Sequence, residues 1–133
     1  MISLDTAKKL KDEGLKWEPG YADFYSWNGQ TYVVSLSDCQ SPTGRAVLRS
    51  KDSIFMPRLD QLLVEIERAG CGFVIRRSDC PETYLDYKSY MSLTKWTDGD
   101  SVKVFERWDL AAEEAAAAAL IWILEQEGKP DAE

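Results

Sequence analysis

The local signal that decides the fold class is the stretch Phe24-Tyr25-Ser26-Trp27-Asn28-Gly29-Gln30-Thr31-Tyr32-Val33-Val34. Asn-Gly is the favoured pair for a two-residue type I′ turn, because both residues tolerate positive φ angles. Aromatic and β-branched residues flank the pair, and these favour strands. We therefore predict a β-hairpin with Tyr25 opposite Tyr32 and Phe24 opposite Val33. Alternation along it predicts one buried face, made of Tyr25, Trp27, Tyr32, Val34 and Leu36.

Three helices are expected around the hairpin. The first has Ser3 or Asp5 as its N-cap and ends at Gly14, where glycine suits the left-handed position of a Schellman motif. The second begins with Pro57 and ends at Gly70, because the residues between them show the apolar spacing of an amphipathic helix. The third follows Asp109 as N-cap and ends near residues 128–130, which read Gly-Lys-Pro.

A three-stranded meander is predicted between the second and third helices. Its strands cover residues 73–77, 83–88 and 102–105, with turns at 79–82 and 98–100. Residues 89–96 are ambiguous between a strand and a loop. Together these elements predict an α+β fold of order α-β-β-α-β-β-β-α, in which an antiparallel sheet of about five strands packs with three helices in a single domain, 1–133.

A long connection, Ser37 to Met56, separates the hairpin from the second helix. Its turn residues 41–44 are followed by 45–49, which we interpret as a short edge strand. From residue 45 to residue 58 the chain is locally basic, since Arg45, Arg49, Lys51 and Arg58 are accompanied by one acid, Asp52. A connection of this length in a compact domain is usually functional or disordered. We therefore treat Ser37–Met56 as a candidate contact surface.

Composition excludes several classes of function. The 133 residues include no histidine, which excludes Ser-His-Asp and Cys-His centres and nearly all zinc sites. No Walker A or G-x-G-x-x-G motif is present, so no nucleotide cradle is predicted. The three cysteines, Cys39, Cys71 and Cys80, have no C-x-x-C spacing, and we expect them to be buried and reduced. We predict no catalytic residue, no metal and no cofactor.

Hydropathy and charge bear on location and partners. The N-terminus lacks the apolar stretch of a signal peptide. The longest apolar run, Ala115 to Leu124, is about half of a membrane span. We therefore expect a cytoplasmic protein with no membrane contact. The net charge is −7, with eight acids against two bases in residues 106–133, so the chain as a whole does not attract nucleic acid.

The last helix motivates the first functional hypothesis. From Ala115 to Leu124 it is apolar on every side, and a single sheet face would cover only part of that surface. The surplus predicts an interface with a partner protein or with a second copy in a homodimer, made of Leu120, Ile121, Trp122, Ile123 and Leu124. A helix central to its own core explains the pattern equally well. Our first interpretation is a non-enzymatic protein-interaction module.

Nucleic-acid binding is the alternative hypothesis. Arg76, Arg77 and Lys88 lie near several aromatic residues of the predicted meander. Rings and cations on an open sheet face stack bases and neutralise phosphates. The patch is small and the chain is acidic, so this function is not favoured.

A metal-dependent nuclease is the third hypothesis. The tripeptide Asp86-Tyr87-Lys88 follows Asp79 and Glu82, an arrangement in which carboxylates hold Mg²⁺ and a lysine orients the attacking water. Chance alone yields about one or two such tripeptides in a chain of this composition. Solvent-exposed ion pairs on a strand explain the same residues.

Three segments together resemble the layout of small uncharacterised proteins encoded by bacteriophages and prophages. They read Leu10-Lys11-Asp12-Glu13-Gly14-Leu15-Lys16-Trp17-Glu18-Pro19, then Pro57-Arg58-Leu59-Asp60-Gln61-Leu62-Leu63-Val64-Glu65-Ile66-Glu67, then Glu113-Glu114-Ala115 running to Leu120-Ile121-Trp122-Ile123-Leu124. They are structural signatures: a capped helix, an amphipathic helix and an alanine-rich helix. The resemblance implies a phage or prophage origin and implies no activity.

Overall fold

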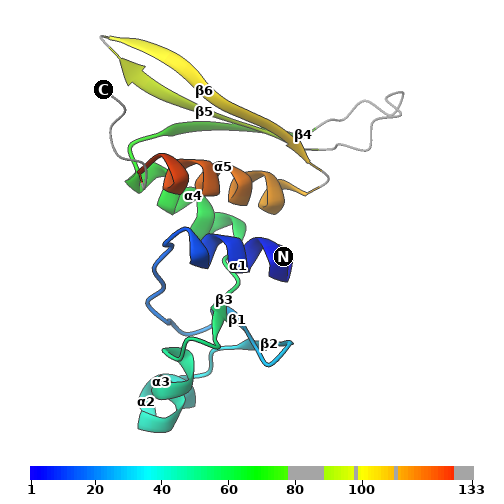
Figure 1. Cartoon of the computed structure of the whole chain (residues 1–133), viewed down its shortest axis with the longest axis vertical. Helices are drawn as coiled ribbons and strands as arrows, with labels where there is room; N and C mark the ends of the chain where they lie inside the picture. The colour runs from blue at the N-terminus through cyan, green and yellow to red at the C-terminus, as the bar shows by residue number, and fades with distance from the viewer. Residues whose placement is uncertain (78–88, 98, 110, 128–133) are drawn as a thin grey trace. The chain divides into compact units, whose positions relative to one another are not determined.

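The computed structural model describes residues 1–77, 89–97, 99–109 and 111–127 (Figure 1). Over these residues the fold is α+β, as predicted, with five helices and two three-stranded antiparallel sheets. The chain divides into two compact units, residues 1–58 and 59–133, which we call unit 1 and unit 2. The organisation of both into a single domain stays a prediction.

Unit 1 is built from a sheet of strand order β2-β1-β3 and three helices. In chain order its elements are α1 Leu4–Asp12, β1 Phe24–Trp27, β2 Gln30–Val33, α2 Leu36–Gln40, α3 Pro42–Leu48 and β3 Ile54–Phe55. The central strand β1 pairs antiparallel with both neighbours. The α1 helix contacts β3, which places the end of α1 beside the chain that enters β3.

The predicted hairpin is confirmed, including its register. Tyr25 pairs with Tyr32 and Phe24 with Val33. The turn residue Asn28 has a φ of +52°, as a type I′ turn requires. The Asn-Gly pair therefore fixes both the position of the turn and the residues that face each other.

The predicted buried face of the hairpin is only partly correct. Tyr25 and Val34 are buried, and Trp27 packs against them. Tyr32 and Leu36 are exposed, because β2 is an edge strand and Leu36 already belongs to α2.

The predicted caps of α1 are confirmed. The Ser3 hydroxyl accepts a hydrogen bond from the Thr6 amide at 3.1 Å. At the other end Gly14 has a φ of +102°, and the Leu15 amide donates to the Leu10 carbonyl at 3.0 Å. This is the hydrogen-bond pattern of a Schellman motif.

The prediction of an edge strand at residues 45–49 is wrong, because residues 45–48 belong to the α3 helix and Arg49 is its C-cap. The α2 helix lies just before it in the same connection. Ser35 caps α2 through a reciprocal pair of hydrogen bonds with Asp38, at 3.0 and 3.1 Å. Ser41 caps α3 by accepting from the Gly44 amide at 2.8 Å, and Pro42 occupies the first helical position. These local caps satisfy amides that a helix start would otherwise leave unpaired, and they outweigh the weak strand preference of one short apolar run.

Unit 2 is a three-stranded antiparallel sheet of order β4-β5-β6 with two helices on one face (Figure 1). Its elements are α4 Leu59–Arg68, β4 Gly72–Arg77, β5 Ser89–Thr97, β6 Asp100–Asp109 and α5 Ala112–Glu127. The α5 helix contacts β5, β6 and α4, while α4 also contacts β4. The core between sheet and helices includes Leu62, Ile66, Met91 and Leu93, all essentially without exposure.

Several predicted boundaries in unit 2 are corrected. The ambiguous segment 89–96 is β5, whereas the predicted strand 83–88 lies outside the described residues. Asp109 ends β6 and is not the N-cap of α5, which begins at Ala112; Pro57 precedes α4 by two residues. The predicted continuous sheet of about five strands is wrong, because the hairpin pairs with β3 and not with the later strands.

Of the helices the structure describes, none is long and apolar enough to cross a membrane.

Candidate functional site

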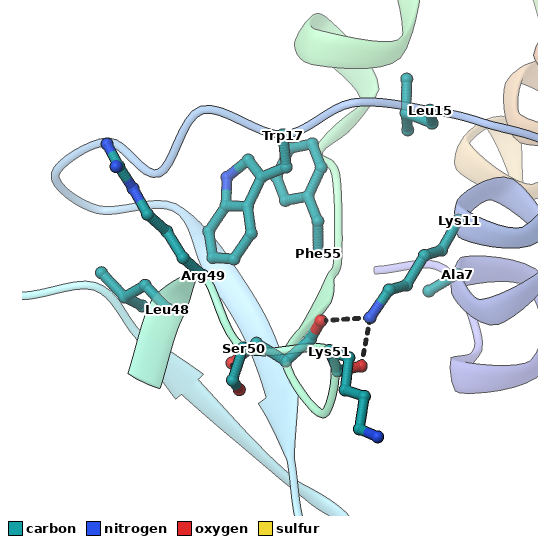
Figure 2. Close-up of a pocket in the computed structure, with 10 residues that line it drawn as sticks. Ala7, Lys11, Leu15, Trp17, Leu48, Arg49, Ser50, Lys51 and Phe55 are labelled. Carbon is teal, nitrogen blue, oxygen red and sulfur yellow. Dashed lines mark hydrogen bonds between the residues drawn. The ribbon is translucent and has the colours of Figure 1, made fainter. Parts of the chain in front are cut away.

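Unit 1 contains a pocket of about 250 Å³ (Figure 2). It is bounded by α1, by the segment that follows α1, and by the chain between the end of α3 and β3. Its apolar lining consists of Ala7, Leu15, Trp17, Leu48 and Phe55, and its polar lining of Lys11, Arg49, Ser50, Lys51 and Ser53. The lining therefore combines two aromatic rings with three cationic residues.

Two stacked rings form the aromatic part of the lining. The indole of Trp17 lies parallel to the ring of Phe55, with centroids 5.1 Å apart and an interplanar angle of 2°. The ring centroids of Trp17 and Tyr25 lie 6.0 Å apart. Leu48, at the end of α3, is buried beside these rings. Burial, followed by the nearby Asp38 carboxylate, raises the pKa of Tyr25 above its usual value. Tyr25 therefore supports this wall as a neutral phenol at physiological pH.

A buried carboxylate fixes the orientation of Trp17. The indole Nε1 donates to Asp23 Oδ2 at 3.0 Å, and the Gly20 amide donates to the same oxygen at 2.9 Å. Arg58 Nη1 lies 3.6 Å from Asp23 Oδ1 and donates to the Ala22 carbonyl at 3.1 Å. Asp23 is only 7% exposed, and a buried carboxylate requires such donors. The indole is thus held before any ligand arrives.

Lys11 ties α1 to the turn that precedes β3. Its Nζ donates to the Ser53 carbonyl at 2.9 Å and also to the Lys51 carbonyl (Figure 2). The Ser53 hydroxyl donates to the Val47 carbonyl at 2.6 Å, which closes the same turn against α3. Hydrogen bonds from an ammonium group are stronger than those between neutral groups. We therefore assign Lys11 a positioning role: it shapes the pocket.

The other two cations of the pocket have no acidic partner among the residues that the structure describes. Arg49 and Lys51 are both exposed, and within the described residues neither side chain forms an ion pair. In Figure 2 their charged ends point away from the Trp17–Phe55 pair. Two uncompensated positive charges therefore stand at the rim of an apolar pocket.

The formal charge differs sharply between the two units. Unit 1 has eight Lys and Arg against seven Asp and Glu, a charge of +1; unit 2 has eight against sixteen, a charge of −8. The acidity of the chain thus belongs to unit 2. An anionic ligand meets no net repulsion from unit 1 itself.

The predicted interface on the last helix is mostly internal to the chain. Leu120, Ile121 and Ile123 are 2%, 8% and 4% exposed, because α5 contacts both the sheet and α4. Trp122 and Leu124 are half-buried, and the Trp122 ring lies 5.8 Å from that of Phe105. Of the two explanations left open by the sequence, a helix central to its own core accounts for three of the five residues.

The predicted nucleic-acid contacts are only partly described. Arg76 pairs in register with Tyr90, which in turn pairs with Trp108 on β6, so these residues form one row across the sheet. Arg76 is exposed and Trp108 is 47% exposed. The ring centroids of Tyr90 and Trp108 lie 4.8 Å apart. Arg77 pairs with Ser89 at the next position, and Lys88 lies outside the described residues.

An acid lies close to this aromatic row. Tyr90 donates its hydroxyl to Glu106 Oε2 at 2.9 Å, and Lys103 Nζ lies 3.3 Å from the same oxygen. The hydrogen bond from Tyr90, together with Lys103, holds the pKa of Glu106 below its usual value. The charge of Lys103 is therefore already paired with Glu106. Arg76 is the cation that lies in register with Tyr90 and Trp108.

Metal binding receives no support from the described residues. Among them, no group of three or more Cys, Asp or Glu side chains is arranged to hold a metal ion. The residues of the nuclease hypothesis, Asp79, Glu82, Asp86 and Lys88, lie outside the described ranges. Cys39 and Cys71 are free, with Cys71 buried and Cys39 half-buried.

Six of the ten lining residues, Arg49 and Lys51 among them, lie in the segment Ser37–Met56, which the sequence marked as a candidate contact surface. The role of this segment as a contact surface stays a prediction. The sequence did not mark Lys11, Trp17 or Asp23 as site residues. Lys11 bonds to carbonyls that are distant in sequence, and Trp17 bonds to Asp23 across a turn of the chain. No protein-family model, curated protein or solved structure matches the chain. The phage or prophage origin and the cytoplasmic location stay predictions.

Proposed function

We propose that the chain is a non-enzymatic binding module that recognises a partner protein through the pocket of unit 1. The observation that carries this proposal is the pairing of an ordered aromatic wall, Trp17 and Phe55, with two cations, Arg49 and Lys51, for which the described part of the chain supplies no acidic partner. Pockets that receive a protruding side chain carry most of the binding energy in many protein interfaces. Aromatic residues and arginine are also enriched there.

The size of the pocket supports a protein partner over a cofactor. Its volume of about 250 Å³ is below the roughly 300–1,000 Å³ of pockets that enclose drug-sized ligands and cofactors. The pocket matches one large side chain, with the rest of the partner on the surrounding surface. Such a contact occurs repeatedly where one protein anchors a segment of another.

Preorganisation supports recognition through this pocket. Asp23 holds the Trp17 indole and Lys11 holds the turn at Lys51 and Ser53, both within unit 1. Immobilising side chains and loops costs about 0.5–1.5 kcal/mol for each rotamer-rich side chain on association. A pocket whose wall is already ordered avoids part of that cost.

The partner in this proposal is a different protein and not a second copy of the chain. Burial of Leu120, Ile121 and Ile123 removes most of the apolar surplus that motivated a homodimer. Only Trp122 and Leu124 of the five retain partial exposure. Two half-buried side chains supply far less apolar area than a stable homodimer buries.

The row Arg76, Tyr90 and Trp108 favours a second candidate function, binding of single-stranded nucleic acid. Aromatic rings beside a cation on a sheet are a common platform for stacked bases. The charge of −8 on unit 2 opposes this function. It requires salt-sensitive binding of a single-stranded oligonucleotide that is lost in Arg76→Glu/Arg77→Glu, and unchanged binding in that variant would exclude it.

The experiment that tests the first proposal compares captured proteins from a bacterial lysate, with and without nuclease, by mass spectrometry. Three baits are used: the wild-type chain, Arg49→Glu/Lys51→Glu, and the control Lys8→Glu/Lys9→Glu, which changes two exposed cations of α1 outside the pocket lining. We expect a nuclease-resistant protein that is captured by the wild type and by the control but lost from the rim variant. Equal capture by all three baits would show that the pocket is not the contact.

A further inference from the structure

We infer that the ligand of this pocket is an acidic peptide segment of the partner, which inserts one large apolar side chain between flanking carboxylates. This inference rests on the proposed function and names the chemistry of the partner. It follows from the separation of two kinds of surface at one site: an apolar interior and a cationic rim.

The interior selects the inserted side chain. Five of the residues that line it are apolar, and among them Trp17 and Phe55 present large ring surfaces. Its nearest polar groups are already engaged, since Lys11 Nζ is directed to two backbone carbonyls and the Ser53 hydroxyl to a third. Two of the three N–H groups of Lys11 Nζ are thereby used, so a charged group placed inside would exchange its shell of water for few remaining donors. The inserted group is apolar, and the volume of about 250 Å³ admits one aromatic or large aliphatic side chain.

The rim selects the residues next to the inserted one. Arg49 directly follows Leu48 at the end of α3, and Lys51 lies in the turn before β3, so both flank the apolar lining. Their charged ends point away from the Trp17–Phe55 pair (Figure 2). They are placed to meet carboxylates that lie outside the pocket, before or after the inserted side chain.

Charge complementarity here contributes specificity more than affinity. An exposed ion pair is worth roughly two- to fivefold in affinity, and rim charges mainly accelerate encounter with an oppositely charged partner. Apolar contact inside the pocket supplies the larger share of the binding energy. The two contributions are therefore separable by changing either the centre or the flanks of a peptide.

The test is an NMR titration of the full-length ¹⁵N-labelled chain with acetyl-Asp-Glu-Phe-Glu-Asp-amide. The readouts are the indole Nε1–H resonance of Trp17 and the backbone amides of residues 48–55. Two matched peptides carry central alanine, or lysines in place of the four acids. Sodium salicylate and inorganic phosphate are the small-molecule probes.

We expect the acidic phenylalanine peptide to shift the Trp17 resonance, with weaker effects from the alanine peptide and the lysine peptide. In Arg49→Ala/Lys51→Ala we expect affinity for the acidic peptide to fall by about 4- to 25-fold, the product of two exposed ion pairs. In the control Lys8→Ala/Lys9→Ala the affinity should stay within about twofold. The exposure of all four residues leaves the fold intact, which the dispersion of the amide spectrum verifies.

Four results would overturn the inference. Equal binding of the alanine peptide would exclude an inserted side chain, and equal binding of the lysine peptide would exclude carboxylate recognition. A Trp17 shift with salicylate or phosphate but with none of the peptides would show a small-anion site. If the peptides fail while capture of a protein still depends on Arg49 and Lys51, the inference falls and the proposed function stands. If capture is also independent of both residues, the proposed function falls with it.

Discussion

The indole Nε1 of Trp17 donates a 3.0 Å hydrogen bond to the buried carboxylate of Asp23. The two residues are six positions apart, and the chain between them turns at Gly20, whose amide donates to the same oxygen. One carboxylate therefore fixes both the turn and the ring that forms the wall of the pocket. The proposed binding through this pocket and the stability of unit 1 therefore depend on the same side chain.

Asp23→Ala should destabilise the protein by about 2–3 kcal/mol. It leaves the Trp17 and Gly20 donors without their acceptor, and a buried unsatisfied donor costs about 1–3 kcal/mol. The ion pair with Arg58 adds little, because the Arg58 side chain is 38% exposed. Urea unfolding followed by tryptophan fluorescence measures the change. Asp23→Asn should lose less, since it keeps an acceptor, and exposed Asp52→Ala should change stability by no more than about 0.5 kcal/mol. A loss in Asp23→Ala no larger than in Asp52→Ala would contradict the assignment.

Gly44→Ala should destabilise unit 1, although the same change normally stabilises a helix by about 0.5–1 kcal/mol. A Cβ at this position would lie 2.7 Å from both the Cα and the carbonyl oxygen of Asp38. Because both atoms belong to the backbone of α2, the two short helices must separate, at a cost of about 1–3 kcal/mol. Urea unfolding compares this variant with Thr43→Ala, an exposed change in the same helix. A more stable Gly44→Ala protein would show that α2 and α3 do not approach each other in this way.

Tyr90→Phe should raise the pKa of Glu106 toward its usual value. The Tyr90 hydroxyl is the first cause of the lowered pKa, followed by Lys103. A carboxyl with a lowered folded-state pKa stabilises the fold at neutral pH, and this contribution is lost as the pH falls through that pKa. The stability lost in Tyr90→Phe is therefore expected at pH 7 and disappears at a pH below both pKa values, whereas the shift in the Glu106 titration itself is read at acidic pH. A ¹³C NMR titration of the Glu106 carboxyl measures it, with Tyr32→Phe as the control because Tyr32 donates to Gln30 instead. An unchanged Glu106 titration in Tyr90→Phe would exclude the hydrogen bond.

Ile123→Ala should destabilise the protein by about 2–5 kcal/mol, the usual range for removing a large aliphatic side chain from a core. Ile123 is 4% exposed and belongs to α5, which contacts both the sheet and α4. Because the burial occurs inside one chain, the unfolding midpoint should not depend on protein concentration. Leu124→Ala, at a half-buried neighbouring position, should cost less. A midpoint that rises with protein concentration would instead support a homodimer through this helix.

Features encoded by adjacent residues were the predictable part of the fold. The Asn28-Gly29 pair specifies a turn type by its backbone preferences, so the hairpin and its register follow from the sequence. Gly14 does the same for the end of α1. The continuous apolar run in α5 correctly predicted a helix, but a helix central to its core and a helix at an interface carry the same pattern.

Features that depend on distant partners were not predictable. The strand pairing between β1 and β3 joins Tyr25 to Phe55, and no local pattern marks that choice over pairing with the later strands. The hydrogen bonds from Lys11 reach carbonyls 40 and 42 residues further along the chain. Short capped helices such as α2 and α3 also escape periodicity, because one or two turns are too few to show it. The pocket therefore became visible only in three dimensions.

Site-specific photo-crosslinking tests the role of the pocket most directly. A photoreactive phenylalanine analogue replaces Ser50, a half-buried residue of the pocket lining, or Lys9, an exposed residue outside it. Irradiation in a bacterial lysate should yield one protein adduct of defined mass from position 50, none from position 9, and none from position 50 when Arg49→Glu/Lys51→Glu is also present. The same adduct from both positions, or an adduct unaffected by the loss of the two cations, would contradict recognition of a partner protein through this pocket.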